Sequence, residues 1–104
     1  MTIKKKSASA RFMEQLTGGE MTLGKLLEAI RLGEESTQTD LARRLSVSRA
    51  HLCDIENGRR IVSPERAARW AKVLGYSPER FVKLAVQDSL NKAGLKLQVE
   101  VRAA

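Results

Sequence analysis

The chain has 104 residues and a formal net charge of +7; apolar residues make up 42% and aromatic residues 4%. This length holds one small domain with extensions, and the basic balance favours nucleic acid as a partner, with solubility alone as the alternative. One cysteine and one histidine exclude an intramolecular disulfide, a cysteine-based zinc site and a histidine cluster. No apolar run suits a signal peptide or a membrane span, which predicts a cytoplasmic protein.

Residues 1–20 read as a basic leader that starts with Lys4, Lys5 and Lys6. Apolar side chains then recur at helical spacing and predict a possible short helix, which Gly18-Gly19 ends. These side chains are Ala8, Phe12, Met13 and Leu16. A disordered leader, a docking helix and a basic arm on DNA phosphates all remain open.

Residues 21–94 carry the main domain. Thr22 suits an N-cap, and the stripe that follows it predicts a helix that ends at Gly33. The stripe consists of Leu23, Leu26, Leu27 and Ile30. Glu34, Glu35 and Ser36 form the polar connection to the next element.

Residues 37–58 predict two short helices joined by a tight turn. Thr37 and Asp40 form a capping-box pattern at the start of the first helix, residues 38–45. The turn is Ser46-Val47, and Ser48 caps the second helix. Asn57-Gly58 closes that helix, because glycine adopts the left-handed conformation at little cost. The inner face comprises Leu41, Ala42, Leu45, Leu52 and Ile55.

Two further helices begin with the same pattern, Ser63-Pro64-Glu65 and Ser77-Pro78-Glu79, in which serine caps the helix and proline takes its first position. The inner residues expected in the first are Ala67, Trp70, Ala71 and Leu74. Those expected in the second are Phe81, Leu84, Ala85 and Leu90, and this helix ends near Ala93-Gly94. Trp70 is expected to be a core residue.

The segment 95–104 changes period. Leu95, Leu97, Val99 and Val101 alternate with polar residues, which predicts one β-strand. No other strand pattern is present, so this strand would pair with its own copy across a two-fold axis, add to the sheet of a partner, or remain a tail. The alternation makes the tail the weakest of these alternatives.

Residues 37–59 resemble the helix-turn-helix of the Cro and lambda-repressor-like family. The small and apolar positions match, as does the ending Glu56-Asn57-Gly58-Arg59; the departure is Ser46, where the family most often has glycine. The resemblance spans roughly residues 22–86. It implies an all-α fold: a five-helix DNA-binding domain, here with an N-terminal leader and a single C-terminal strand.

The outward face of the second helix is expected to read bases in the major groove of double-stranded DNA. Arg49 suits guanine O6 and N7, and Ala50 suits a thymine methyl. Asp54 accepts from cytosine N4 or supports a nearby arginine, and His51 reaches a base, reaches a phosphate or is simply exposed.

The phosphate contacts are expected from Gln38, Arg43, Arg44, Ser48, Asn57, Arg59 and Arg60. Gln38 and Asn57 enter this set by resemblance to the family. Arg43 and Arg44 equally suit a solvated face on which they pair with acids.

The sequence therefore predicts a transcriptional regulator, a homodimeric repressor of its own operon that binds a palindromic operator. The alternative is an antitoxin that also neutralises a toxin protein, because the two extensions resemble toxin-binding segments of family antitoxins. A ligand sensor is disfavoured because no second domain forms a pocket. No enzyme, catalytic residue, metal site or cofactor is predicted, since Cys53 and His51 lie two positions apart on one helix and point in different directions.

Overall fold

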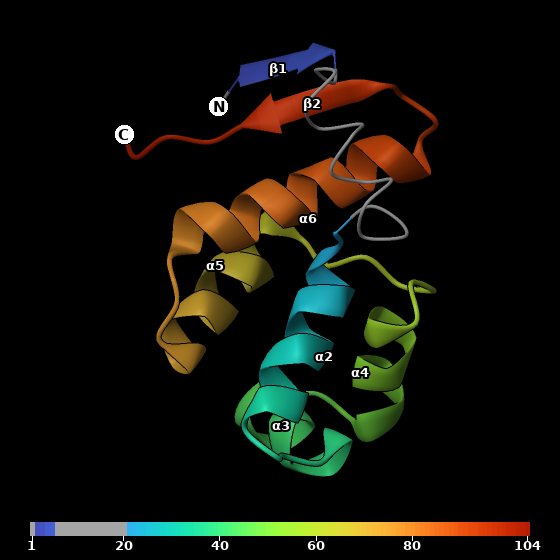
Figure 1. The fold of residues 1–104 in the computed structure, drawn as a ribbon, viewed down its shortest axis with the longest axis vertical. Helices are drawn as coiled ribbons and strands as arrows, with labels where there is room; N and C mark the ends of the chain where they lie inside the picture. Colours follow the sequence, from blue (N-terminus) through green and yellow to red (C-terminus); the bar gives the residue numbers. More distant parts are fainter. Residues whose placement is uncertain (1, 6–20) are drawn as a thin grey trace.

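The computed structural model describes residues 2–5, for which only the backbone is considered, and residues 21–104. This part of the chain contains five helices and two strands (Figure 1). The helices are α2 (Leu23–Gly33), α3 (Gln38–Arg44), α4 (Arg49–Glu56), α5 (Pro64–Leu74) and α6 (Pro78–Lys92). The strands are β1 (Thr2–Lys5) and β2 (Leu97–Glu100). The predicted five-helix domain and C-terminal strand are confirmed, whereas the possible leader helix lies outside the described residues.

The two strands lie at one end of the long axis of the molecule and α3 lies at the other (Figure 1). Helix α6 runs beneath the strands, and below it α2 stands between α5 and α4. Both α3 and α4 carry exposed residues, Arg43 and Arg44 on α3 and Arg49 and Ala50 on α4. No described helix combines the length and apolar character needed to cross a membrane.

All five predicted N-cap residues occupy that position. The hydroxyls of Thr22, Thr37, Ser48 and Ser63 each accept a hydrogen bond from the backbone N–H three residues ahead. Ser77 is the N-cap residue of α6 without such a bond. Its hydroxyl donates instead to the Glu79 carboxylate at 2.7 Å, because that acid lies within reach in the first turn.

A single apolar core joins the five helices. Its members are Leu23, Leu27, Ile30, Leu41, Ala42, Leu45, Leu52, Ile55, Val62, Ala67, Trp70, Ala71, Leu74, Phe81 and Ala85. Trp70 is 4% exposed, which confirms that it is a core residue. Leu84 and Leu90, predicted to face inward, are only half-buried.

Two backbone positions set how α4 is held. A Cβ placed on Gly24 of α2 would collide with the carbonyl oxygen of Ile55, so these helices approach too closely for any other residue. Ser46, in the turn between α3 and α4, has φ +58°, a left-handed conformation that favours glycine. The turn therefore holds a serine in this conformation at some conformational cost.

The prediction that the C-terminal strand finds no strand partner in its own chain was wrong. Strand β2 pairs antiparallel with β1, with Thr2 opposite Glu100 and Lys5 opposite Leu97. The sequence of β1 does not alternate, because Ile3 is its one apolar residue and Lys4 and Lys5 follow it. The single C-terminal strand is therefore one half of a two-stranded sheet.

The other edge of β2 is covered by a side chain of α6. The Gln87 amide donates to the Leu97 carbonyl oxygen at 2.7 Å and accepts from the Val99 N–H at 2.9 Å. Gln87 thus supplies the donor and the acceptor that a third strand would supply. Of the four predicted interface residues, Val99 is buried, Leu97 and Val101 are half-buried, and Leu95 is exposed.

Candidate nucleic-acid interface

Helix α4 is anchored by its inner face and presents its outer face to solvent. Leu52 and Ile55 are almost fully buried against the core, whereas Arg49 and Ala50 are exposed at the first turn. His51 and Asp54 lie half-buried on the flanks. The four predicted base-reading residues thus share one helix, two of them exposed and two on its flanks, and a helix has the width that fits the major groove.

A buried ion pair fixes the end of α4 to the two preceding helices. The Glu56 carboxylate accepts from Arg31 Nε and Nη2, both at 3.0 Å, and from the Gln38 side-chain amide at 3.0 Å. Arg31 also donates to the Ser36 carbonyl oxygen at 3.3 Å, and its hydrogen bonds to Glu56 raise the pKa of Arg31. Gln38, a predicted phosphate ligand, thus has a structural partner inside the domain.

Asp54 is engaged with an arginine in this structure. Its Oδ1 accepts from Arg59 Nε at 3.0 Å, and this hydrogen bond raises the pKa of Arg59. Of the two roles that the sequence left open for Asp54, this geometry corresponds to the support of an arginine. The Asn57 side chain folds back and donates to the Cys53 carbonyl oxygen at 2.9 Å.

Two of the predicted phosphate ligands pair with acids on the surface of the domain. Arg44 lies 2.9 Å from a Glu34 oxygen, and Arg43 lies 3.9 Å from an Asp40 oxygen. Both pairs are largely exposed, so each contributes little to the stability of the domain. Arg43 and Arg44 match the alternative in which they form a solvated, acid-paired face.

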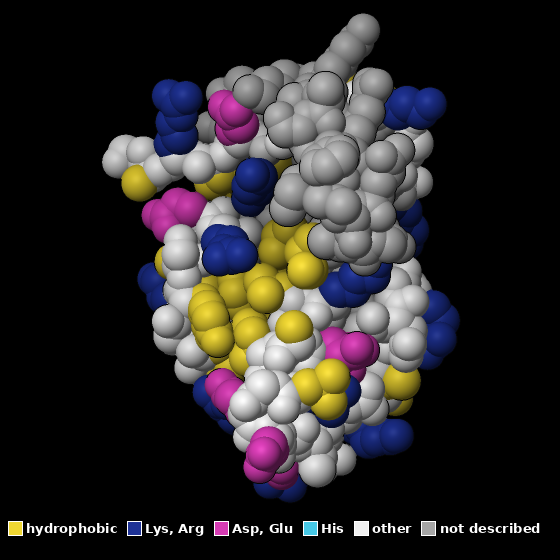
Figure 2. All heavy atoms as spheres, viewed as in Figure 1, with side chains coloured by type: hydrophobic (Ala, Val, Ile, Leu, Met, Phe, Trp, Pro, Cys, Tyr) yellow, Lys and Arg dark blue, Asp and Glu magenta, His cyan; other side chains and the backbone are white. Residues whose placement is uncertain are grey.

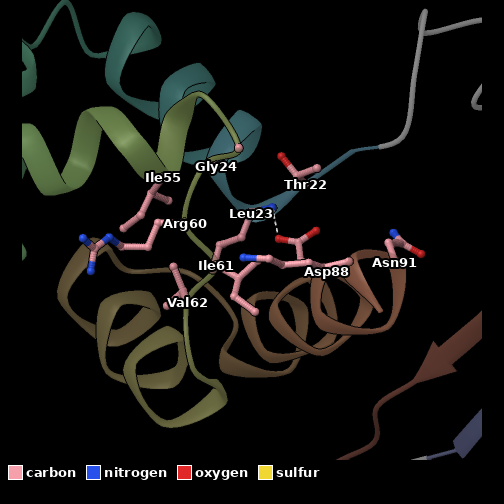
Figure 3. Close-up of a pocket in the computed structure, with 11 residues that line it drawn as sticks. Thr22, Leu23, Gly24, Ile55, Arg60, Ile61, Val62, Asp88 and Asn91 are labelled. Carbon is pink, nitrogen blue, oxygen red and sulfur yellow. Dashed lines mark hydrogen bonds between the residues drawn. The ribbon is translucent and has the colours of Figure 1, made fainter. Parts of the chain in front are cut away.

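Arg49 and Arg60 have no acidic partner among residues 21–104. Figure 3 shows the Arg60 side chain directed away from Asp88 and Leu23, out of the pocket that the loop after α4 helps to form. Basic side chains also gather along the edge of the molecule where α4 lies (Figure 2). These uncompensated cations suit a polyanion.

His51 lies in a basic neighbourhood. Its Nε2 is 3.5 Å from Arg66 Nη1, which belongs to α5. Burial lowers the pKa of His51 most, and the positive charges of Arg60 and Arg66 lower it further, against the opposing effect of Asp54. The flank of α4 is therefore electropositive even with a neutral imidazole.

The pocket in Figure 3 has a volume of about 330 Å³ and lies between α2, α6 and the loop after α4. Asp88 of α6 lines this pocket, and its carboxylate accepts a hydrogen bond from the Leu23 N–H at 3.0 Å. This bond connects α6 to the start of α2. The sequence had given no sign of a hollow within the single domain. Across the described residues, no group of three His, Cys, Asp or Glu side chains is placed to hold a metal ion.

Sequence reasoning missed the buried polar residues Glu56 and Gln87 and the half-buried Arg31, because each looks like an ordinary surface residue in an amphipathic helix. It also missed the basic face of α5. The signal for that face was present, since Arg66 and Arg69 lie three residues apart and so share one side of a helix.

Comparisons with known proteins agree with this geometry. A family model described as helix-turn-helix matches residues 23–81. The structure is similar to the crystal structure of a hypothetical transcription factor, NHTF, from Neisseria, with a TM-score of 0.51 and 21% identity over 68% of this chain and 79% of that one. At this identity the likeness bears on the fold alone. No curated protein sequence matches the chain significantly.

Proposed function

Because the chain belongs to the helix-turn-helix family of DNA-binding transcriptional regulators, we propose that it is a dimeric repressor that binds a palindromic operator upstream of its own gene. The observation that carries the proposal is the outward face of α4. There, Arg49 is exposed and has no acidic partner in the described part of the chain. A dimer would place two such helices about 34 Å apart, one turn of DNA.

The residues divide into two roles. Arg49 reads guanine through two hydrogen bonds, and Ala50 contacts a thymine methyl. Asp54 holds Arg59 at the rim of the same face, where Arg59 and Arg60 bind phosphates together with the polar groups of Ser48 and Asn57. Phosphate contacts set register, and base contacts set sequence preference.

Gln38 belongs to the phosphate set through the second N–H of its side-chain amide, because the first N–H is donated to the Glu56 carboxylate. Its amide nitrogen is held by Glu56 at 3.0 Å, so the side chain is fixed before DNA arrives. Arg43 and Arg44 stay with their acidic partners and add only long-range attraction, which salt screens.

The antitoxin alternative rests on the N-terminal leader and the C-terminal strand, which resemble toxin-binding segments of family antitoxins. Strand β2 is engaged on one edge by β1 and on the other by the Gln87 amide. A toxin, or a second copy of this chain, would therefore have to displace one of these contacts to pair with β2. We place the dimer contact on a surface other than the edges of β2.

The test measures binding of the full chain to the DNA upstream of its own gene and to a random duplex of equal length. Arg49→Ala should weaken binding to the upstream DNA by about 1–3 kcal/mol and leave the random duplex almost unaffected. Arg59→Ala is the matched control. It should weaken binding to both duplexes about equally and lower the slope of log K against log salt by about 1.

Two results would oppose the proposal. If Arg49→Ala weakened binding to the upstream DNA and to the random duplex equally, Arg49 would not read a base. Wild-type protein that shows no preference for the upstream DNA, or that protects only one half-site, would contradict a dimeric repressor of its own gene.

A further inference from the structure

Helix α5 carries a basic surface outside the helix-turn-helix. Arg66 and Arg69 form one wall of a groove of about 330 Å³, which lies between α5 and the turn at Ser46 and Val47. Trp70 is also among the residues that line the groove. A groove with apolar and guanidinium walls can accept both a sugar ring and a phosphate group.

Arg66 connects this groove to the helix that faces the DNA bases. Its Nη1 lies 3.5 Å from the Nε2 of His51, in the first turns of α4. On its other side, its guanidinium carbon lies 5.8 Å from the centre of the Trp70 ring. A cation over an aromatic face is attracted to the ring, so this contact favours the position that Arg66 takes beside the groove.

The charges on this surface are not neutralised within the protein. Arg44, which also lines the groove, pairs with Glu34 at 2.9 Å. Arg66 and Arg69, by contrast, have no acidic partner anywhere in residues 21–104. Two adjacent uncompensated guanidinium groups repel each other and favour an anion between them, and guanidinium groups bind phosphate oxygens through paired hydrogen bonds.

We propose that Arg66 and Arg69 bind the sugar–phosphate backbone of the DNA into which α4 inserts, on the side of the groove next to His51. The inference rests on the proposed function and extends the DNA footprint from the helix-turn-helix onto α5. DNA is favoured over an acidic protein because the basic surface is continuous with the first turns of α4. The contacts of Arg66 and Arg69 with the backbone would not depend on the DNA sequence, and they would contribute affinity and orientation.

The test compares salt dependence for the full-length chain and its variants, Arg66→Gln, Arg69→Gln and the double variant. Binding is followed by fluorescence anisotropy on the upstream DNA and on a random duplex, between about 50 and 200 mM salt. Each single variant should lower the slope of log K against log salt by about 0.9, and the double variant by about twice that, on both duplexes.

Lys96→Gln is the charge-matched control. Lys96 is exposed in the connection between α6 and β2, at the end of the molecule opposite α3 and α4 (Figure 1). Arg66→Lys keeps the charge and should keep the wild-type slope. Thermal unfolding, followed by the fluorescence of Trp70, shows whether each variant is folded.

The outcomes separate the inference from the proposed function. In one outcome, the wild-type protein binds while the salt slopes of Arg66→Gln and Arg69→Gln equal the salt slope of Lys96→Gln. This result would overturn the inference and leave the proposed function intact. Absence of wild-type binding to either duplex would overturn the proposed function and the inference with it. A lower slope for Arg66→Gln, restored in Arg66→Lys, would support the phosphate contact.

Discussion

The buried ion pair between Arg31 and Glu56 makes the sharpest prediction for stability. The two side chains are 15% and 1% exposed, so Arg31→Met would leave a carboxylate in the interior without its cationic partner. Breaking a buried pair in this way costs about 3–5 kcal/mol. Because the Gln38 amide still donates to Glu56 at 3.0 Å, we expect the lower end, about 3 kcal/mol of unfolding free energy.

The assay is urea unfolding followed by the fluorescence of Trp70, the one tryptophan of the chain, which is 4% exposed. Arg44→Met is the matched control, since the Arg44 and Glu34 side chains are 43% and 42% exposed and their pair contributes at most about 1 kcal/mol. The double variant Arg31→Met with Glu56→Leu should be more stable than Arg31→Met alone, because it also removes the stranded charge.

Two results would refute this reasoning. A loss for Arg31→Met no larger than that for Arg44→Met would show that the interior tolerates the lone carboxylate. Losses that add in the double variant would show that the two residues do not act as a pair.

The remaining predictions concern packing, pH and the terminal sheet. Gly24→Ala should cost about 1–3 kcal/mol in urea unfolding, since α4 leaves no room for a methyl group, whereas Gly33→Ala, with open space around it, should stabilise by about 0.5–1 kcal/mol. The pKa of His51 is lowered in the folded state, so the unfolded chain binds more protons in the pH range between the two pKa values. The stability that neutral His51 contributes is therefore complete above the pKa of the unfolded state. It is lost as the pH falls through the pKa of the folded state. Stability curves of wild type and His51→Gln should therefore diverge on acidification, and parallel curves would contradict the shift. Gln87→Leu should cost about 1–3 kcal/mol and accelerate amide exchange at Val99, which hydrogen-exchange NMR would detect.

Local sequence signals predicted most of the fold because the interactions concerned are local. The capping hydroxyls of Thr22, Thr37, Ser48 and Ser63 act within three residues of their own position. Ser77 also occupies the N-cap position, but its hydroxyl donates to Glu79 and makes no capping bond. Residue propensity predicts which residue caps a helix, and it does not predict which of two nearby partners the hydroxyl takes.

Sequence signals predicted the outward face of α4 and missed the contacts that hold it. The pairs Arg31–Glu56 and Gln87–Val99 join residues of different elements, and burial of these polar groups depends on how the elements pack. Strand β1 shows the same limit. Its partner lies at the far end of the sequence, so no window along the chain contains both.

The pairing of residues 2–5 with residues 97–100 has a consequence for the order of folding. The most extensive contacts in the helical core join neighbours in sequence, α5 with α6 and α3 with α4, although α2 also contacts α4 and α6. The sheet brings together the described segments that are most distant in sequence. Long-range pairing carries a larger loop-closure entropy and forms more slowly than local contacts. During synthesis, the helices can fold while β1 waits for β2 to emerge from the ribosome. We therefore expect the sheet to form last and to open first, while α4 keeps its place in the folded core.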